Sequence, residues 1–173
     1  AMIAPRVEAG IAGLELAPAA CVDVTSGKIT IASGLGTVEL VDPLLRGRGD
    51  GSWNGTSGIT STTAAASGGE RTVGWLDNGD GSVTAAYAAG GDTNLDWEVD
   101  LLDVTNVLGG GKFNSGEPAT WAEGDFTYDG VVDILDLTDF MSSGLFNAGN
   151  YNAPGGAIAA VPEPAALGGC AAG

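Results

Sequence analysis

An acidic twelve-residue pattern occurs twice in this chain, and it limits the fold more than any other feature. The first copy starts at Asp92 and the second at Asp125, 33 residues later. In each copy, residues with side-chain oxygens occupy loop positions 1, 3, 5, 9 and 12, and position 7 can offer its backbone carbonyl. This is the spacing with which one loop wraps a calcium ion.

Calcium is a hard cation that takes six to eight oxygen ligands, and carboxylates crowded into one loop repel one another until a cation lies among them. The first predicted site consists of Asp92, Asn94, Asp96, Asp100 and Asp103 with the carbonyl of Glu98. The second consists of Asp125, Thr127, Asp129, Asp133 and Asp136 with the carbonyl of Val131. We therefore expect two calcium ions as cofactors. The alternative, a pair of solvated acidic turns, is disfavoured because the two copies match in register.

The repeat continues beyond both loops as a stripe of apolar residues. The matching positions are Leu101, Val104 and Leu108 in the first copy and Ile134, Leu137 and Met141 in the second. Their spacing of three to four residues predicts a short amphipathic helix after each loop. Gly111 and Gly144 are expected to end these helices.

Two loop–helix halves of the form D-x-N-x-D-x-x-V-D-x-x-D resemble the dockerin module. The variant in this chain, GDTNLDWEVDLLDV and then WAEGDFTYDGVVDILDLTDF, is similar to the dockerin-type C-terminal regions of secreted planctomycete-like bacterial proteins. The resemblance implies two EF-hand-like halves packed around a pseudo-twofold axis. It also implies an exported protein at the bacterial cell surface.

The sequence departs from the dockerin pattern at three places. Trp97 replaces the usual Gly at position 6 of the first loop, where a positive φ strains a bulky residue. Thr127 replaces Asn or Asp at position 3 of the second loop, so a weaker or more hydrated site is expected there. Positions 10 and 11 are the apolar pairs Leu101-Leu102 and Ile134-Leu135, where cellulosomal dockerins carry polar residues that contact cohesin. Cohesin binding is therefore not expected.

The chain before the repeat has the pattern of short strands and turns. Residues 22–25 and 28–31 predict two strands around a Ser-Gly turn. Residues 37–46 predict a short helix that tolerates Pro43 only in its first turn or at a break. Residues 72–76 and 82–87 predict a hairpin across an Asn- and Gly-containing turn.

The expected fold class is α+β, with a small β-rich N-terminal part packed on the dockerin-like pair of loop–helix units. Residues 1–20 form either an apolar leader or an inter-subunit strand, 21–90 a β-rich subdomain, and 91–152 the calcium-binding domain. Residues 153–173 form an Ala/Gly/Pro-rich tail. Within the tail, Val161-Pro162-Glu163-Pro164 resembles the V-P-E-P (PEP-CTERM-like) sorting signal of exported bacterial proteins, and no membrane span is expected in this chain.

The composition excludes several classes of function. Acidic residues number 22 against 6 basic ones, which gives a net charge of −16 and no basic patch for nucleic acid. The chain contains no histidine, the commonest general base and zinc ligand. We therefore do not expect an enzyme.

Two further features leave alternatives open. Asn54-Gly-Thr56 is an acceptor motif for N-glycosylation, and a plain polar loop is the alternative. Cys21 and Cys170 can form a disulfide in an oxidising compartment, or remain two unpaired small residues.

These observations predict a non-catalytic, extracellular, calcium-stabilised structural protein that self-assembles into a surface layer or fibril. The alternative is a dockerin-type module that binds or anchors another protein. A third reading is a carbohydrate-binding module, in which the four tryptophans at 53, 75, 97 and 121 act as stacking platforms for a glycan partner.

Overall fold

A four-stranded sheet in the order β1-β3-β6-β5 runs through the centre of this α+β protein. The computed structural model describes residues 8–33 and 36–153. The strands of this sheet are β1 (Glu8–Ile11), β3 (Lys28–Ile31), β6 (Val83–Ala88) and β5 (Thr72–Asp77). β1 runs parallel to β3, and the other two neighbouring pairs are antiparallel.

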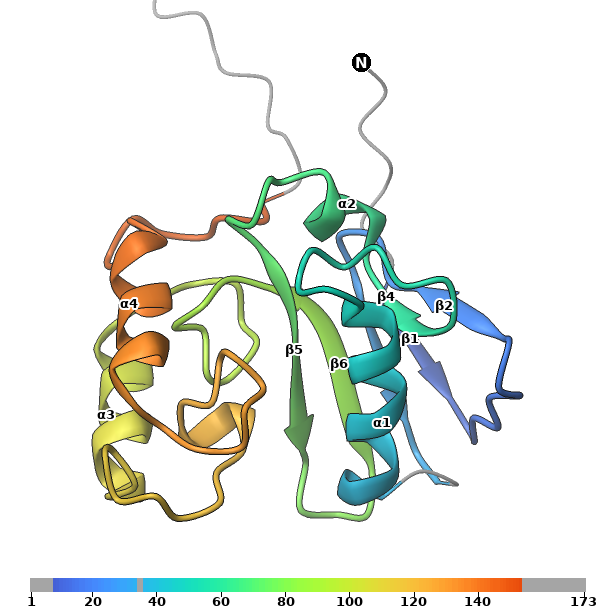
Figure 1. The fold of residues 1–173 in the computed structure, drawn as a ribbon, viewed down its shortest axis with the longest axis horizontal. Coiled ribbons are helices and arrows are strands. Elements are labelled where there is room, and N and C mark those ends of the chain that lie inside the picture. The colour runs from blue at the N-terminus through green and yellow to red at the C-terminus, as the bar shows by residue number, and fades with distance from the viewer. Residues whose placement is uncertain (1–7, 34–35, 154–173) are drawn as a thin grey trace, which may run out of the picture.

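The predicted hairpin is confirmed by β5 and β6, which pair along their whole length from Thr72↔Ala88 to Asp77↔Val83. Its turn is closed by side chains, since the carboxylate of Asp77 accepts the amide of Gly79 at 2.8 Å. All six residues of β6 are buried because the strand lies between β3 and β5 and is covered on both faces. The hairpin is the centre of the molecule (Figure 1).

A smaller sheet and two helices lie to one side of the hairpin (Figure 1). The sheet pairs β2 (Cys21–Asp23) with β4 (Gly58–Thr60) in parallel, and the helices are α1 (Thr37–Arg48) and the short α2 (Thr62–Ala65). The two strands expected at 22–25 and 28–31 are therefore present, but they belong to different sheets.

The expectation for Pro43 is wrong, because α1 continues through it to Arg48. A proline in a helix interior loses a backbone hydrogen bond and strains the preceding turn. Leu40 and Leu44, on either side of Pro43, are completely buried. Their burial in the core offsets the local penalty, as tertiary packing commonly does for helices.

The N-terminal segment pairs within its own chain. Residues 8–11, expected to be part of a leader or of an inter-subunit strand, form β1 on the edge of the sheet. Residues 1–7, 34–35 and 154–173 lie outside the described residues, and so do Cys170 and the 161–164 motif. Within the described part, no helix has the length and apolar character needed to cross a membrane.

The acidic repeat occupies the other side of the hairpin as two loop–helix units. α3 (Leu101–Gly110) follows the first loop and α4 (Ile134–Ser142) the second, with the short 3-10 helix η1 (Trp121–Glu123) between them. Gly111 ends α3 in the left-handed conformation, as predicted. α4 ends at Ser142, two residues before Gly144.

The two units exchange contacts crosswise. Val99 of the first loop forms a parallel bridge with Phe146 after α4, and Phe113 after α3 forms the same bridge with Val132 of the second loop. Matching hydrogen bonds run from Asn147 N to Val99 O at 2.8 Å and from Asn114 N to Val132 O at 2.7 Å. The residues in one contact are equivalent, 33 positions apart in the sequence, to those in the other. Such reciprocal contacts are typical of two halves related by a local twofold axis.

One hydrophobic core joins the sheet to the loop–helix units. The four tryptophans belong to it, with exposed fractions of only 0–6%. Their rings pack inside the protein and expose little surface on which a sugar could stack. At Gly74 the backbone of β5 packs tightly against the loop–helix units. A Cβ there would lie 2.5 Å from Trp121 Cε2 and 2.7 Å from Leu95 Cδ2.

We predict that Gly74→Val destabilises the protein by about 1–3 kcal/mol, because the added side chain forces β5 away from Trp121 and Leu95. Chemical denaturation would measure the free energy of unfolding. Gly10→Ala is the matched control, because a Cβ at this strand glycine meets nothing within 4 Å. Equal stability of Gly74→Val and wild type would show that the sheet and the loops are not tightly packed.

Candidate metal centres

The two acidic loops follow the same backbone course. Position 4 has a positive φ in both, 57° at Leu95 and 64° at Tyr128. Position 6 does as well, with 68° at Trp97 and 90° at Gly130. Trp97 thus adopts the conformation that Gly has in the second loop, and it does not reshape the first loop.

The first carboxylate of each loop is buried and accepts backbone amides from inside the loop. Asp92 Oδ1 accepts Asp96 N at 3.3 Å, and Asp92 Oδ2 accepts Trp97 N at 3.0 Å. Asp125 Oδ1 and Oδ2 accept the corresponding amides of Asp129 at 3.2 Å and Gly130 at 3.0 Å. The amides at positions 5 and 6 therefore have equivalent roles in both loops.

The last carboxylate closes each loop onto its helix. Asp103, fully buried, accepts the amide of Thr93 at 2.8 Å on Oδ1 and that of Asp100 at 2.8 Å on Oδ2. In the second loop, Asp136 Oδ1 accepts Phe126 N at 2.8 Å and Thr127 N at 2.9 Å, and its Oδ2 accepts Asp133 N at 2.8 Å.

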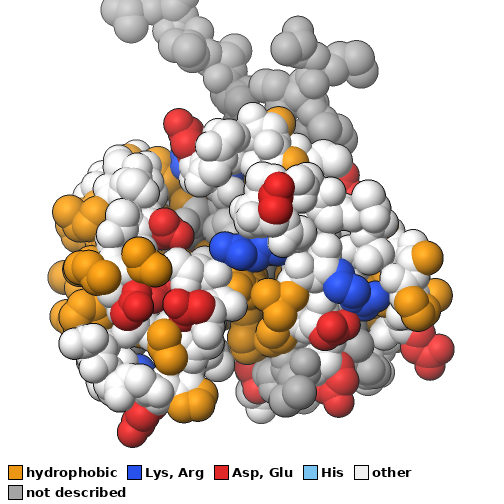
Figure 2. Space-filling model, viewed as in Figure 1, with side chains coloured by type: hydrophobic (Ala, Val, Ile, Leu, Met, Phe, Trp, Pro, Cys, Tyr) orange, Lys and Arg blue, Asp and Glu red, His pale blue; other side chains and the backbone are white. Residues whose placement is uncertain are grey.

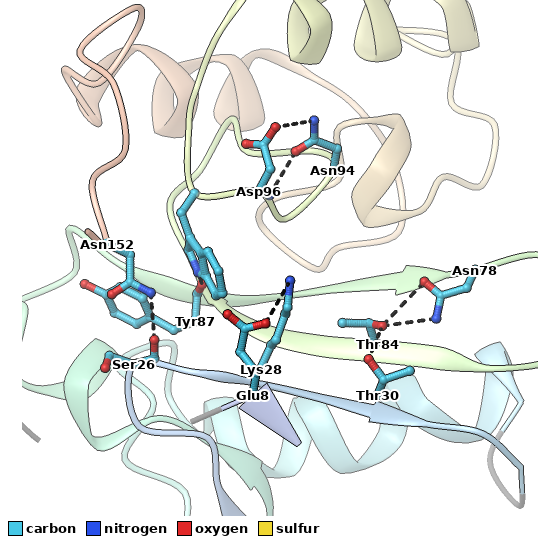
Figure 3. A network of polar contacts seen from close by, with 11 residues as sticks. Glu8, Ser26, Lys28, Thr30, Asn78, Thr84, Tyr87, Asn94, Asp96 and Asn152 are labelled. Atoms are coloured by element: carbon cyan, nitrogen blue, oxygen red, sulfur yellow. Dashed lines mark hydrogen bonds and ion pairs between the residues drawn. The ribbon is translucent and has the colours of Figure 1, made fainter. Parts of the chain in front are cut away.

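Residues at positions 3, 5 and 9 stabilise the local turns. Asn94 Oδ1 accepts the amide of Asp96 at 3.0 Å, and Asn94 Nδ2 donates to Asp96 Oδ2 at 2.8 Å (Figure 3). Asp100 and Asp133 are the N-caps of α3 and α4, each accepting an amide two residues on at 2.7 Å. The predicted ligands thus also start the helices.

Several oxygens at predicted ligand positions have no donor among the described residues. Thr127 Oγ1, at position 3 of the second loop, is buried without a hydrogen-bond partner. The carbonyl oxygens of Glu98 and Val131, at position 7, accept no hydrogen bond from a described residue. A buried polar atom without a partner is rare in proteins and often marks a bound ion or water. These oxygens are of the type that calcium prefers.

The first carboxylate of each loop carries an electrostatic penalty. Burial raises the pKa of Asp92 to about 7, with the charges of Asp103 and Asp96 acting in the same direction and the Tyr151 hydroxyl opposing them. Burial, together with the charges of Asp136 and Asp129, likewise raises the pKa of Asp125 to about 6. Positions 1, 5 and 12 of each loop therefore lie close enough to repel one another, and a cation would relieve that repulsion.

The carboxylates do not already form a closed ligand cluster. Within the described residues, no three acidic, Cys or His side chains surround one point as metal ligands. Their oxygens accept backbone amides instead, but a carboxylate oxygen has a second lone pair that can bind a cation. The donor set, the shared loop conformation and the unpartnered Thr127 hydroxyl together fit calcium as the ion that these loops would hold.

Two residues that bind carboxylates of the first loop, one outside the loop and one at its position 2, were not singled out from the sequence. Tyr151 donates its hydroxyl to Asp92 Oδ2 at 2.6 Å and its amide to Trp97 O at 2.9 Å. Thr93 adds a hydroxyl bond to Asp103 Oδ1 at 2.7 Å. Position 2 of the second loop is Phe126, and Pro118 precedes Tyr151 by 33 residues. Because neither contact is repeated, the internal repeat contained no signal for it.

Two of the tryptophans connect the acidic loops to the rest of the molecule. Trp121, in the connector between the units, is completely buried and donates Nε1 to Asp92 O at 2.7 Å. Trp97 donates Nε1 to Tyr87 O at 2.9 Å, and Lys28 lies over its ring. The bulky residue at position 6 thus connects the first loop to the sheet, which explains the departure from Gly.

The two modification sites are both exposed. Asn54 lies in the loop before β4, and its Nδ2 donates to Asp50 Oδ2 at 3.1 Å. Cys21 is exposed at the start of β2 and forms no disulfide with a described residue. Its pairing with Cys170 stays a prediction because Cys170 is outside the described residues.

Comparison of the chain with protein-family models, with curated proteins and with solved structures found no match. The resemblance to dockerins therefore rests on the two loops and their spacing alone.

We predict that, in the presence of a chelator, the free energy of unfolding decreases as the pH rises from 5 to 8, by an amount on the order of a few kcal/mol. The raised pKa values of about 7 for Asp92 and about 6 for Asp125 mean that the folded state binds protons more tightly than the unfolded state. Stability is then highest at low pH in this window and falls as each carboxyl ionises. Denaturation curves at several pH values would measure this.

The same titration in calcium should show the opposite trend. Calcium binds the ionised carboxylates, so its stabilising effect is larger at pH 8 than at pH 5. If stability in the chelator rose with pH instead, the buried loop carboxylates could not be the dominant titrating groups.

Proposed function

We propose that this chain is a non-catalytic, extracellular, calcium-stabilised structural module that self-assembles through an apolar face on α3 and α4. The alternative is that the same face binds a different protein, as a dockerin-type module would.

The observation that carries this proposal is the exposure of large apolar side chains on the two loop–helix units. The apolar face consists of Leu101, Leu102, Leu108, Phe113, Ile134, Leu135, Leu137, Met141 and Phe146, with exposed fractions of 42–70%. In Figure 2 hydrophobic side chains gather along the edge of the molecule formed by α3 and α4. An apolar stripe at helical spacing ordinarily packs on a core, but much of this one faces solvent.

Exposure on this scale favours an interface. Single exposed apolar residues are normal on protein surfaces, whereas a contiguous patch usually marks a contact with another macromolecule. The face also has a shallow hollow of about 90 Å³ lined by Val104, Leu108, Phe113, Leu137 and Phe140, among others. A protruding apolar side chain of a partner could fill it.

The acidic loops support the calcium part of the proposal because they start both helices. Asp100 and Asp133 cap α3 and α4, and Asp103 and Asp136 occupy the third position of each helix. Order in a loop therefore fixes the start of the helix that carries the apolar face. Bound calcium would supply the positive charge that offsets the crowded carboxylates.

The net negative charge of the chain supports the proposal that self-association depends on calcium. Two copies with a net charge of −16 repel each other, and residues 91–152 contain one basic residue, Lys112. Two calcium ions per chain would reduce that repulsion beside the apolar face. A basic partner protein, by contrast, would be attracted to the calcium-free chain.

The absence of histidine from the sequence supports a non-catalytic role. The four buried carboxylates among the described residues, Asp92, Asp103, Asp125 and Asp136, all accept backbone amides within the loops. Export is supported by the resemblance of residues 161–164 to a sorting motif, and a structural calcium site would suit the extracellular space, where modules commonly bind calcium weakly.

We predict that calorimetry finds two calcium ions per chain. Asp92→Asn and Asp125→Asn should each weaken one of the two binding events by at least about tenfold, because position 1 loses its charge. Asp77→Asn is the matched control. The substitution removes the same charge, but from a carboxylate that closes the hairpin turn outside both loops. Absence of calcium uptake by the wild type would refute the calcium assignment.

We also predict that the double variant Leu108→Ser and Met141→Ser abolishes self-association but leaves calcium binding intact. These side chains are 70% and 69% exposed, so their loss should change the stability of the monomer by less than about 1 kcal/mol. Leu45→Ser, at a 43% exposed leucine on α1, is the control. Sedimentation and electron microscopy in millimolar calcium, repeated after chelation, would report the assemblies.

Isolated particles of the wild type in both conditions would contradict self-assembly. The apolar face would then be tested against other proteins, starting with those that carry basic groups around an apolar surface.

A further inference from the structure

Two arginines stand out in the ion-pair pattern of this acidic protein. Lys28 pairs with Glu8 at 3.8 Å, Arg46 with Asp42 at 3.1 Å, and Lys112 with Glu123 at 2.8 Å. These pairs leave Arg48 and Arg71, neither of which forms an ion pair with a described residue. Both line one cleft between the β-rich part and the end of α4.

Tyrosine rings hold both guanidinium groups in place. The guanidinium carbon of Arg48 lies 5.7 Å from the ring centre of Tyr128, and that of Arg71 lies 5.5 Å from the ring centre of Tyr151. The rings are themselves fixed, because Tyr128 donates its hydroxyl to Val73 O and Tyr151 donates to a loop carboxylate. Each guanidinium has five N–H groups. Arg71 donates from Nη1 to Glu70 O and also hydrogen-bonds the Tyr87 hydroxyl, which leaves further N–H groups for a ligand.

The cleft has the size of a small-ligand site. Its volume is about 300 Å³, at the lower end for small-molecule pockets. Trp53 and Phe126 line it, and both are more than 95% buried. Figure 2 shows basic atoms in the hollow between the two sides of the molecule.

The cleft also offers hydrogen-bond acceptors. The carboxylate of Asp139 accepts no hydrogen bond from a described residue, and Asp136 and Arg48 are its charged neighbours. The hydroxyls of Ser142 and Ser143 donate to backbone carbonyls at 3.2 Å and 2.7 Å. Ser143 Oγ also accepts the amide of Leu145 at 3.4 Å, so each hydroxyl oxygen keeps at least one lone pair as an acceptor. Cationic donors from the β-rich part thus share the cleft with acceptors from α4.

We propose that this cleft binds a uronate-type sugar unit, a small ring that carries one carboxylate and several hydroxyls. The carboxylate pairs with Arg48 and Arg71, and the hydroxyls donate to Asp139 and the two serines. A bare anion such as sulfate has no donor for Asp139, and a neutral sugar leaves both guanidinium groups without a charge partner. The cleft shares no lining residue with the apolar face, so the sugar and a second copy of the chain would bind at different places.

The test is calorimetry on the full calcium-loaded chain with glucuronate, glucose and sulfate as separate probes. Glucuronate is expected to bind more tightly than either of the others. Arg71→Gln and Arg48→Gln should each weaken glucuronate by at least about tenfold, the effect expected for losing a charged hydrogen-bond pair. Arg46→Gln is the matched control, because it removes one positive charge from the same helix but outside the cleft.

Three outcomes would overturn the proposal. These are the absence of glucuronate binding, equal binding of sulfate, and an equal loss in the Arg46→Gln control. Arg48→Gln removes the contact with the Tyr128 ring and could destabilise the fold. Arg71→Gln keeps the test decisive in that case, because Arg71 lies just before β5 and its guanidinium lies over the ring of Tyr151 rather than that of Tyr128.

Discussion

The buried carboxylate of Asp92 is the point on which the structure depends most. Its side chain receives the amide of Trp97 and the hydroxyl of Tyr151, and its backbone carbonyl receives the indole of Trp121. One residue thereby joins the first loop, the connector between the units and the chain after α4. Burying a charge is costly unless it is well bonded, and burial raises the pKa of Asp92 even though its carboxylate accepts these bonds. A cation is the natural complement of such a site.

The pseudo-symmetry of the two loops is broken where they contact the sheet. Tyr128 at position 4 of the second loop reaches Val73, and Leu95 at the same position of the first loop lies against the site of Gly74. At position 6, the indole of Trp97 packs in the core, whereas Gly130 has no side chain. The repeat preserves the oxygens and the backbone conformation, whereas packing against a single asymmetric sheet makes the apolar positions diverge.

Local patterns predicted the loops, both short helices and the β5–β6 hairpin, because each depends on residues within about a dozen positions. Long-range packing determined what the sequence could not show. The continuation of α1 through Pro43 depends on the burial of Leu40 and Leu44, and the separation of β2 from β3 depends on β4. Tyr151 lies 59 residues from Asp92, and no repeat or spacing indicates that contact. The cleft likewise combines Arg48, Arg71 and Asp139 from three distant segments.

Charge connects these features. Most of the acidic residues in the loops accept backbone amides, which fix the conformation of the loops, but the carboxylates still repel one another. The apolar face begins directly after Asp100 and Asp133, two of the residues that would hold calcium. The arginine cleft depends on Tyr151, which donates to Asp92. An ion in the first loop would therefore act on two surfaces at once: it would order the start of α3 and steady the ring beneath Arg71. Calcium would then be a common condition for both surfaces, although their ligands differ.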